Sequence, residues 1–121
     1  MKHIILVEDD PILLKVLAKE FKDAGYEVSQ AVDGEEGLQL VRMKHPDIVL
    51  LDIIMPKMDG IEVLRKLKEN PGTKRIPVFM LTVLSDPKRL AEAVSLGAAA
   101  YLVKSEQDVS DVVAKVKKQI G

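Results

Sequence analysis

The sequence alternates between apolar runs and amphipathic segments of helical period, and it does so five times. Strict strand–helix alternation with short connections is typical of parallel sheets with right-handed crossovers, so the pattern predicts an α/β fold. The 121 residues divide into five units of about 24 each, too few to close an eight-stranded barrel. We therefore expect an open, doubly wound sheet of five parallel strands, a (βα)5 arrangement. The expected strands are His3–Val7, Tyr26–Val32, Asp47–Asp52, Pro77–Thr82 and Ala99–Lys104.

These five runs differ in polarity. Ile4–Val7, Ile48–Leu51 and Val78–Leu81 are continuously apolar, as in strands that are covered on both faces. The Tyr26–Val32 run mixes polar and apolar residues, so we expect it at an edge of the sheet.

Four of the expected helices begin with an aspartate. Two of these aspartates precede a proline, a residue that suits the first helical position. The other two are followed three residues later by a glutamate, which predicts a reciprocal capping box. Gly25 and Gly97 stand where helices should end in a left-handed residue. The four starts are Asp10-Pro11, Asp86-Pro87, Asp33-Gly34-Glu35-Glu36 and Asp59-Gly60-Ile61-Glu62.

Composition excludes several classes of protein. The chain has no cysteine, which rules out a disulfide scaffold, a thiolate zinc site and thiol catalysis. Its formal net charge is -1 and its basic residues are scattered along the sequence, so direct binding of nucleic acid is not expected. No apolar run approaches the ~18 residues of a membrane span. We expect one soluble, cytoplasmic domain over residues 1–121 that does not contact a membrane.

Functional groups are expected at the carboxyl ends of the strands, because doubly wound sheets bind ligands beside the point where the strand order reverses. The first run ends in Glu8, Asp9 and Asp10, and the third ends in Asp52. If these two strands are neighbours, their carboxylates converge and repel one another unless a cation lies between them. A hard divalent ion fits best, since all the candidate ligands are oxygens, and Mg²⁺ takes one or two carboxylates while keeping several waters.

The fourth and fifth runs add Thr82 and Lys104 at the same edge. A hydroxyl donor and a positive charge beside a metal and a carboxylate are the parts of a phosphoryl-transfer site. Asp52 would then be the nucleophile and would form an acyl phosphate. Taken alone, each residue also has an ordinary interpretation, with Glu8 and Asp9 in a solvated loop. The hypothesis of a site depends on all of them meeting at one edge.

Several motifs occur together along the chain: Ile5-Leu6-Val7-Glu8-Asp9-Asp10-Pro11, Asp47-Ile48-Val49-Leu50-Leu51-Asp52-Ile53-Ile54-Met55-Pro56, Met58-Asp59-Gly60, Leu81-Thr82 and Gly97-Ala98-Ala99-Ala100-Tyr101-Leu102-Val103-Lys104. With them, essentially the whole chain resembles the receiver domain of bacterial two-component response regulators, of the single-domain chemotaxis-regulator type. The resemblance implies a flavodoxin-like fold with strand order 2-1-3-4-5.

The resemblance also implies roles for the acidic residues. Asp52 would be the phosphoacceptor and a ligand of Mg²⁺. Asp9 would bind Mg²⁺ directly, Glu8 would act through water, and the main-chain carbonyl of Ile54 would complete the protein's share of the coordination.

Three further residues would respond to the phosphoryl group. By the same resemblance, Thr82 and Lys104 would contact it, and Tyr101 would be an aromatic switch whose ring turns inward when Thr82 moves toward the phosphate. This would alter the surface around the last two helices and the last strand, as in a two-state element biased by local charge.

The partners implied are a sensor histidine kinase or a histidine phosphotransfer protein as donor, and an unidentified downstream protein as target. The chain would catalyse only its own phosphorylation and dephosphorylation and would otherwise not be an enzyme. We expect a monomer, and dimerisation on phosphorylation is left open.

The chain departs from the family pattern in two places. Val83 follows the threonine where the family usually has a very small residue, and Ser105 follows the lysine where the family usually has proline. A degenerate receiver that only binds partners therefore stays an alternative. In addition, Ile54 and Leu84 are apolar where a polar side chain could position a hydrolytic water, which predicts slow dephosphorylation.

Two further alternatives are a phosphatase and a cofactor-binding module. An aspartate-nucleophile phosphatase of the haloacid-dehalogenase type needs a carboxylate two residues after the nucleophile, and Ile54 stands there. A flavin- or nucleotide-binding module would need a Gly/Ser/Thr-rich loop after the first strand, where this chain has Glu8-Asp9-Asp10-Pro11.

Overall fold

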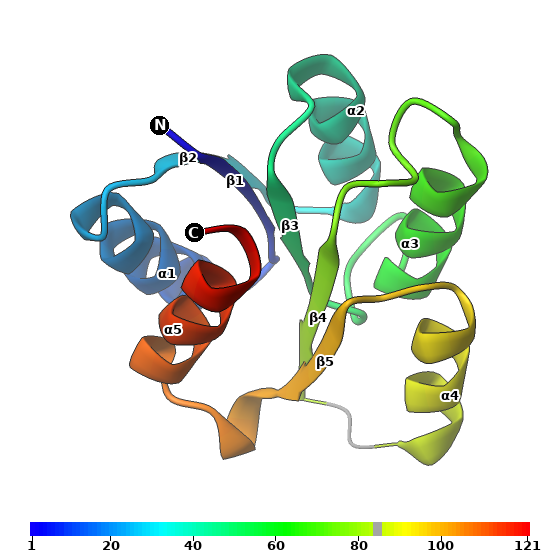
Figure 1. The fold of residues 1–121 in the computed structure, drawn as a ribbon. Helices are drawn as coiled ribbons and strands as arrows, with labels where there is room; N and C mark the ends of the chain where they lie inside the picture. The colour runs from blue at the N-terminus through cyan, green and yellow to red at the C-terminus, as the bar shows by residue number, and fades with distance from the viewer. Residues whose placement is uncertain (84–85) are drawn as a thin grey trace.

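The computed structural model describes residues 1–83 and 86–121. Over these residues strands and helices alternate as expected (Figure 1). Even α1, with 13 residues, is too short to cross a bilayer, and no helix in the described ranges has the length and apolar character of a membrane span. The elements are β1 (His3–Val7), α1 (Pro11–Asp23), β2 (Glu27–Ala31), α2 (Gly34–Lys44), β3 (Ile48–Leu51), α3 (Gly60–Glu69), β4 (Val78–Thr82), α4 (Pro87–Ser95), β5 (Ala100–Val103), a 3₁₀ turn η1 (Lys104–Glu106) and α5 (Val109–Ile120).

The strands form one parallel sheet in the order β2-β1-β3-β4-β5. Helices α1 and α5 cover one face of this sheet, and α2, α3 and α4 cover the other (Figure 1). This arrangement confirms the doubly wound, flavodoxin-like fold and its strand order. The chain leaves β1 toward β2 and then returns to β3, so the strand order reverses beside β1.

The three central strands are buried on both faces. Every residue of Ile4–Val7, Ile48–Leu51 and Val78–Thr82 is buried, which confirms the interpretation of the apolar runs. Strand β2 lies at an edge, and only its last residue, Ala31, is buried. The polar and apolar mixture in this run therefore correctly indicated an edge strand.

Aspartates begin all four of the helices for which the sequence predicted them. Asp10 accepts hydrogen bonds from two main-chain N–H groups of α1, and Asp86 accepts one, from Lys88 of α4. Asp33 and Asp59 accept the N–H of the residue three positions on, but the reciprocal half of the predicted capping boxes does not form. Glu36 instead accepts the N–H of Val32 at 2.9 Å, one residue earlier than a capping box requires.

Gly34 allows α2 to approach the loop between β3 and α3. A Cβ atom added at Gly34 would overlap the main-chain carbonyl oxygen of Met58 and lie 2.9 Å from a methyl group of Val63. Neither the loop main chain nor the buried valine can move away cheaply, because cores are close-packed. This contact holds the loop that follows the carboxyl end of β3.

We expect Gly34→Ala to lower the free energy of unfolding by about 1–3 kcal/mol, because overpacking forces the main chain apart. Urea denaturation followed by circular dichroism measures the change. Gly72→Ala is the matched control, since an added Cβ there comes only within 3.3 Å of the flexible Asn70 side chain. If the two variants unfold at the same urea concentration, the close approach of α2 to this loop does not matter for stability.

Candidate functional site

Asp52 follows β3 directly and is held by the main chain around it. Its side chain is buried, with 5% of the residue exposed, and its N–H donates to the carbonyl of Val7 at 3.0 Å. Oδ1 accepts the N–H of Ile53 at 2.7 Å and, more weakly, that of Ile54 at 3.4 Å. These bonds orient the carboxylate, and Oδ2 faces the remaining polar groups of the site.

Gly60 closes the loop behind Asp52. Its N–H donates to the carbonyl of Ile53 at 2.8 Å, and an added Cβ would overlap the carbonyl oxygen of Asp52. No other residue fits at this position without moving the main chain of the aspartate. Gly60 is therefore a positioning residue for Asp52.

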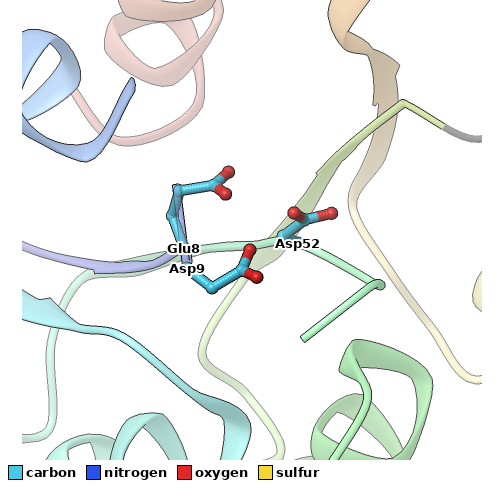
Figure 2. A group of neighbouring side chains, drawn as sticks. All are labelled: Glu8, Asp9 and Asp52. Carbon is cyan, nitrogen blue, oxygen red and sulfur yellow. The ribbon is translucent and has the colours of Figure 1, made fainter. Parts of the chain in front are cut away.

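Glu8 and Asp9 bring two more carboxylates to the same place from the end of β1 (Figure 2). Carboxylate oxygens of Glu8, Asp9 and Asp52 lie within 4.8 Å of one another. Glu8 is 3% exposed, and its Oε2 accepts the N–H of Asp10 at 3.0 Å, whereas Asp9 is exposed. Burial contradicts the solvated-loop interpretation for Glu8, whereas Asp9 is exposed and that interpretation stays open for it.

Lys104 reaches this cluster from the end of β5. Its Nζ lies 2.7 Å from Glu8 Oε1 and 3.1 Å from Asp52 Oδ2. The residues after β5 form the 3₁₀ turn η1, with Ser105 at its centre. With a serine in this position, the lysine still points at Asp52.

Burial and the ammonium group compete in setting the charges of this site. Burial raises the pKa of Glu8 to about 7, although the hydrogen bond from Lys104 acts in the opposite direction. Burial also disfavours the charge on Lys104, but its hydrogen bonds to Glu8 and Asp52 outweigh this and hold the pKa of Lys104 above its ordinary value. Lys104 is therefore charged at neutral pH, and its ammonium group opposes the tendency of burial to neutralise Glu8.

Thr82 lies on β4, which pairs with β3, and Tyr101 lies one strand further out, on β5. Thr82 ends β4 and is fully buried. Tyr101, on β5, is half-buried and packs against the core on the side of α2, α3 and α4. Burial raises the pKa of Tyr101, and the negative charge of Asp86 at the start of α4 adds to the effect while Arg89 opposes it. The charges at the start of α4 therefore act on the tyrosine hydroxyl.

Two apolar side chains lie near the opening of the site. Ile54, two residues after Asp52, is 51% exposed, and Val83, directly after Thr82, is 61% exposed. Leu84, for which the sequence suggested an effect on hydrolysis, lies outside the described residues.

The cluster has the donor chemistry of a hard divalent cation. All its ligand atoms are carboxylate oxygens, two of the three residues are buried, and three negative charges would repel one another without compensation. A cation of this type and the ammonium of Lys104 could together neutralise an anionic group bound at Asp52.

The structure also contains contacts that the sequence did not suggest. Glu8 pairs with Lys104 more closely than Asp52 does, and the N–H of Asp10 holds Glu8. Asp10 had been assigned to helix capping alone. The bond from Asp10 leaves no signal in the sequence, because every residue except proline has a main-chain N–H.

Curated relatives match this chain over part of their length. RpaA of Synechocystis, a DNA-binding dual master transcriptional regulator, is 37% identical over 117 residues, which is 97% of this chain and 48% of the relative. The response regulator PleD of Caulobacter vibrioides is 39% identical over 107 residues, 88% of this chain and 24% of PleD. The chain therefore spans less than half the length of each of these two relatives.

Solved structures agree with the fold over nearly all of the chain. The Vibrio cholerae chemotaxis protein CheY4 superposes with a TM-score of 0.89 at 28% identity, covering 100% of this chain and 99% of CheY4. The Mn²⁺-bound form of the response regulator Rcp1 gives a TM-score of 0.83 at 30% identity, covering 98% and 91%. The family model of the response regulator receiver domain matches residues 4–117. This chain therefore belongs to the receiver-domain family of response regulators, as its motifs indicated.

Proposed function

We propose that this receiver domain is a phosphorylation-dependent switch that accepts a phosphoryl group on Asp52. The observation that carries the proposal is the contact of a buried carboxylate with an ammonium group, beside two further carboxylates. Lys104 lies 3.1 Å from Asp52, and oxygens of Glu8 and Asp9 are within 4.8 Å. A lone structural aspartate would not need these groups.

The transfer forms one bond and breaks one. A carboxylate oxygen of Asp52 attacks the phosphorus of a phosphohistidine, the P–N bond breaks, and its electron pair stays on the imidazole nitrogen of the donor. The product is an acyl phosphate, which adds about one negative charge to the site. The main-chain N–H groups of Ile53 and Ile54 hold the carboxylate in position, and Lys104 balances the added charge.

Mg²⁺ is the cation that we propose for the acidic cluster. Asp9, Asp52 and the main-chain carbonyl of Ile54 would hold it directly and Glu8 through water. When bound, Mg²⁺ neutralises negative charge on the transferred group and its acceptor. The Mn²⁺ bound by Rcp1 supports a divalent ion in this family.

Phosphorylation would be transmitted through Thr82 and Tyr101. We expect the Thr82 hydroxyl to donate to the phosphoryl group, and the ring of Tyr101 to turn inward as Thr82 moves. The packing of α4 against β5 supports this, because a turn of the Tyr101 ring on β5 would be felt by the neighbouring helix.

The donor would be a sensor histidine kinase or a histidine phosphotransfer protein, and the target another protein. The proposal includes residues 1–121 as one receiver unit that is monomeric before phosphorylation and located in the cytoplasm. In this role the chain acts on itself and does not turn over a separate substrate.

We expect incubation with acetyl phosphate and Mg²⁺ to add one phosphoryl group to the protein. Asp52→Asn should abolish the gain, because an amide is not a nucleophile of this kind, and chelation of Mg²⁺ should reduce it strongly. Intact-mass spectrometry measures all three conditions.

If acetyl phosphate does not phosphorylate the protein, two explanations can be distinguished by experiment. If Val83 blocks small donors, Val83→Ala should restore labelling by acetyl phosphate, and a phosphohistidine donor should label both proteins. If neither change gives labelling, the chain is a degenerate receiver and the proposed function is wrong.

We expect the phosphorylated protein to lose its phosphoryl group slowly, because the apolar side chain of Ile54 does not position water. Ile54→Asn should speed the loss by about tenfold or more, since a carboxamide can orient an attacking water. The time course of the phosphorylated mass after removal of the donor measures this. Ile54→Leu is the control and should decay like the parent; decay within seconds that Ile54→Asn leaves unchanged contradicts the prediction.

We expect Lys104→Met to lower the free energy of unfolding by roughly 3 kcal/mol in metal-free buffer, because it leaves two buried carboxylates without their cation. Mg²⁺ should then bind about tenfold more tightly than to the parent protein, since it no longer competes with the ammonium group. Urea denaturation with increasing Mg²⁺ measures both effects.

Lys118→Met, at an exposed position on α5, is the control for the loss of one positive charge. It should change neither the stability nor the response to Mg²⁺. If Mg²⁺ stabilises Lys104→Met no more than the parent, the cation does not bind at this cluster.

A further inference from the structure

The outer side of β2 carries main-chain groups that no neighbouring strand uses. In this strand the N–H of Glu27 and the carbonyl of Ala31 bond to the residues that flank β1. Main-chain groups of alternate residues point to opposite sides of a strand. The N–H and C=O groups of Val28 and Gln30 therefore point away from the sheet, where β2 is the last strand.

This free edge ends at a definite point. The N–H of Val32 donates to Glu36 Oε1 at 2.9 Å, so the main chain beyond Gln30 is already bonded. The exposed edge is therefore limited to the stretch from Val28 to Gln30. Such an edge can pair with an added strand.

A groove of about 620 Å³ lies beside this edge, between β2 and α1. Leu14 and Ala18 of α1 give it an apolar floor, and the side chains of Gln30 and Val32 form its other wall. Val32 is 52% exposed, so its side chain is available for contact. A side chain of an added strand would find apolar contacts here.

The rim of the groove is positively charged. Lys15, Lys19 and Lys22 line it from α1, at the i, i+4 and i+7 positions of a single helix face. Lys19 pairs with Asp23 at 2.7 Å. Within the described ranges no carboxylate lies within ion-pair distance of Lys15 or Lys22. The groove therefore has an excess of positive charge although the whole chain has a net charge of -1.

We propose that this groove binds an extended, acidic segment of a partner protein, which adds to the sheet as a sixth strand beside β2. Its main chain would bond to Val28 and Gln30, its apolar side chains would cover the groove floor, and its carboxylates would pair with Lys15 and Lys22. The surface is separate from Asp52, so the proposal does not depend on phosphorylation.

The positive charge of the lysine row also argues against a second copy of this chain as the added strand. Two copies that paired through β2 would each bring the same lysine row to the shared edge, and these rows would repel each other. An acidic strand has the opposite charge and suits both the edge and its rim.

The probe is a short, blocked peptide with valine and threonine between glutamates, and its counterpart with lysines in place of the glutamates. We expect the acidic peptide to shift the amide resonances of Val28 and Gln30 and to slow exchange of these two amide protons with solvent. Binding should weaken as salt is raised. The basic peptide should bind at least tenfold more weakly.

Substitutions test the edge and the rim separately. Gln30→Pro removes an N–H that points away from β1, so it should leave the sheet intact and abolish binding, whereas Gln30→Ala keeps the N–H and should bind like the parent. Replacing Lys15 and Lys22 by alanine should weaken binding about tenfold. The same change at two exposed lysines of α5, Lys117 and Lys118, should have no effect.

Several outcomes would overturn the proposal. These are equal binding of the two peptides, unchanged binding to Gln30→Pro in a folded protein, and peptide shifts that centre on Lys104 and Asp52. Self-association in sedimentation that Gln30→Pro removes would identify a second copy as the occupant. An acidic peptide that binds nowhere at millimolar concentration also contradicts it.

Discussion

The three central strands have no exposed face, so their residues are apolar from one end to the other and polar groups can appear only where each strand stops. Because β1 and β3 are neighbours, the residues that follow them share one edge of the sheet. Glu8 and Asp52 are the first residues after these strands, and burial of the strands therefore brings their carboxylates together. The close approach of Gly60 to the main chain of Asp52 holds the loop that follows β3 in place.

The same burial creates an electrostatic problem that has three physical solutions. A carboxylate in a poorly solvated place can take up a proton, pair with a fixed cation or bind a metal ion. Glu8, with its pKa raised to about 7, is close to the first solution, and Lys104 provides the second. The third is open to Mg²⁺ in the proposed function. An acyl phosphate at Asp52 would add negative charge at a place where the carboxylates already outnumber the single ammonium group of Lys104. The added charge can therefore favour a different arrangement of Thr82 and its neighbours.

Periodicity predicted the elements well because it reflects burial, which a single sequence records. The apolar runs gave the central strands, and the polar Tyr26–Val32 run gave the edge strand. The strand order itself came only from the family resemblance. The lengths of the connecting helices do not determine it, because the same helices could connect the strands in several different orders. Contacts between distant segments were the least predictable. The 2.7 Å contact between Glu8 and Lys104, for example, depends on how the loops after β1 and β5 pack. A local detail also differed, since Glu36 accepts the N–H of Val32 and not that of Asp33.

The lysines of α1 show why a charge pattern along a sequence differs from one on a surface. Lys15, Lys19 and Lys22 are separated by apolar and acidic residues, and in the sequence they look scattered. A helix brings positions three and four apart to one face, so folding collects them into a row beside the edge of β2. Three acidic groups, those of Glu8, Asp9 and Asp52, gather instead at the carboxyl end of the sheet. A net charge close to zero therefore conceals two regions of opposite sign. In the two proposals above, the acidic region would bind a cation and a phosphoryl group, and the basic region would bind an acidic strand.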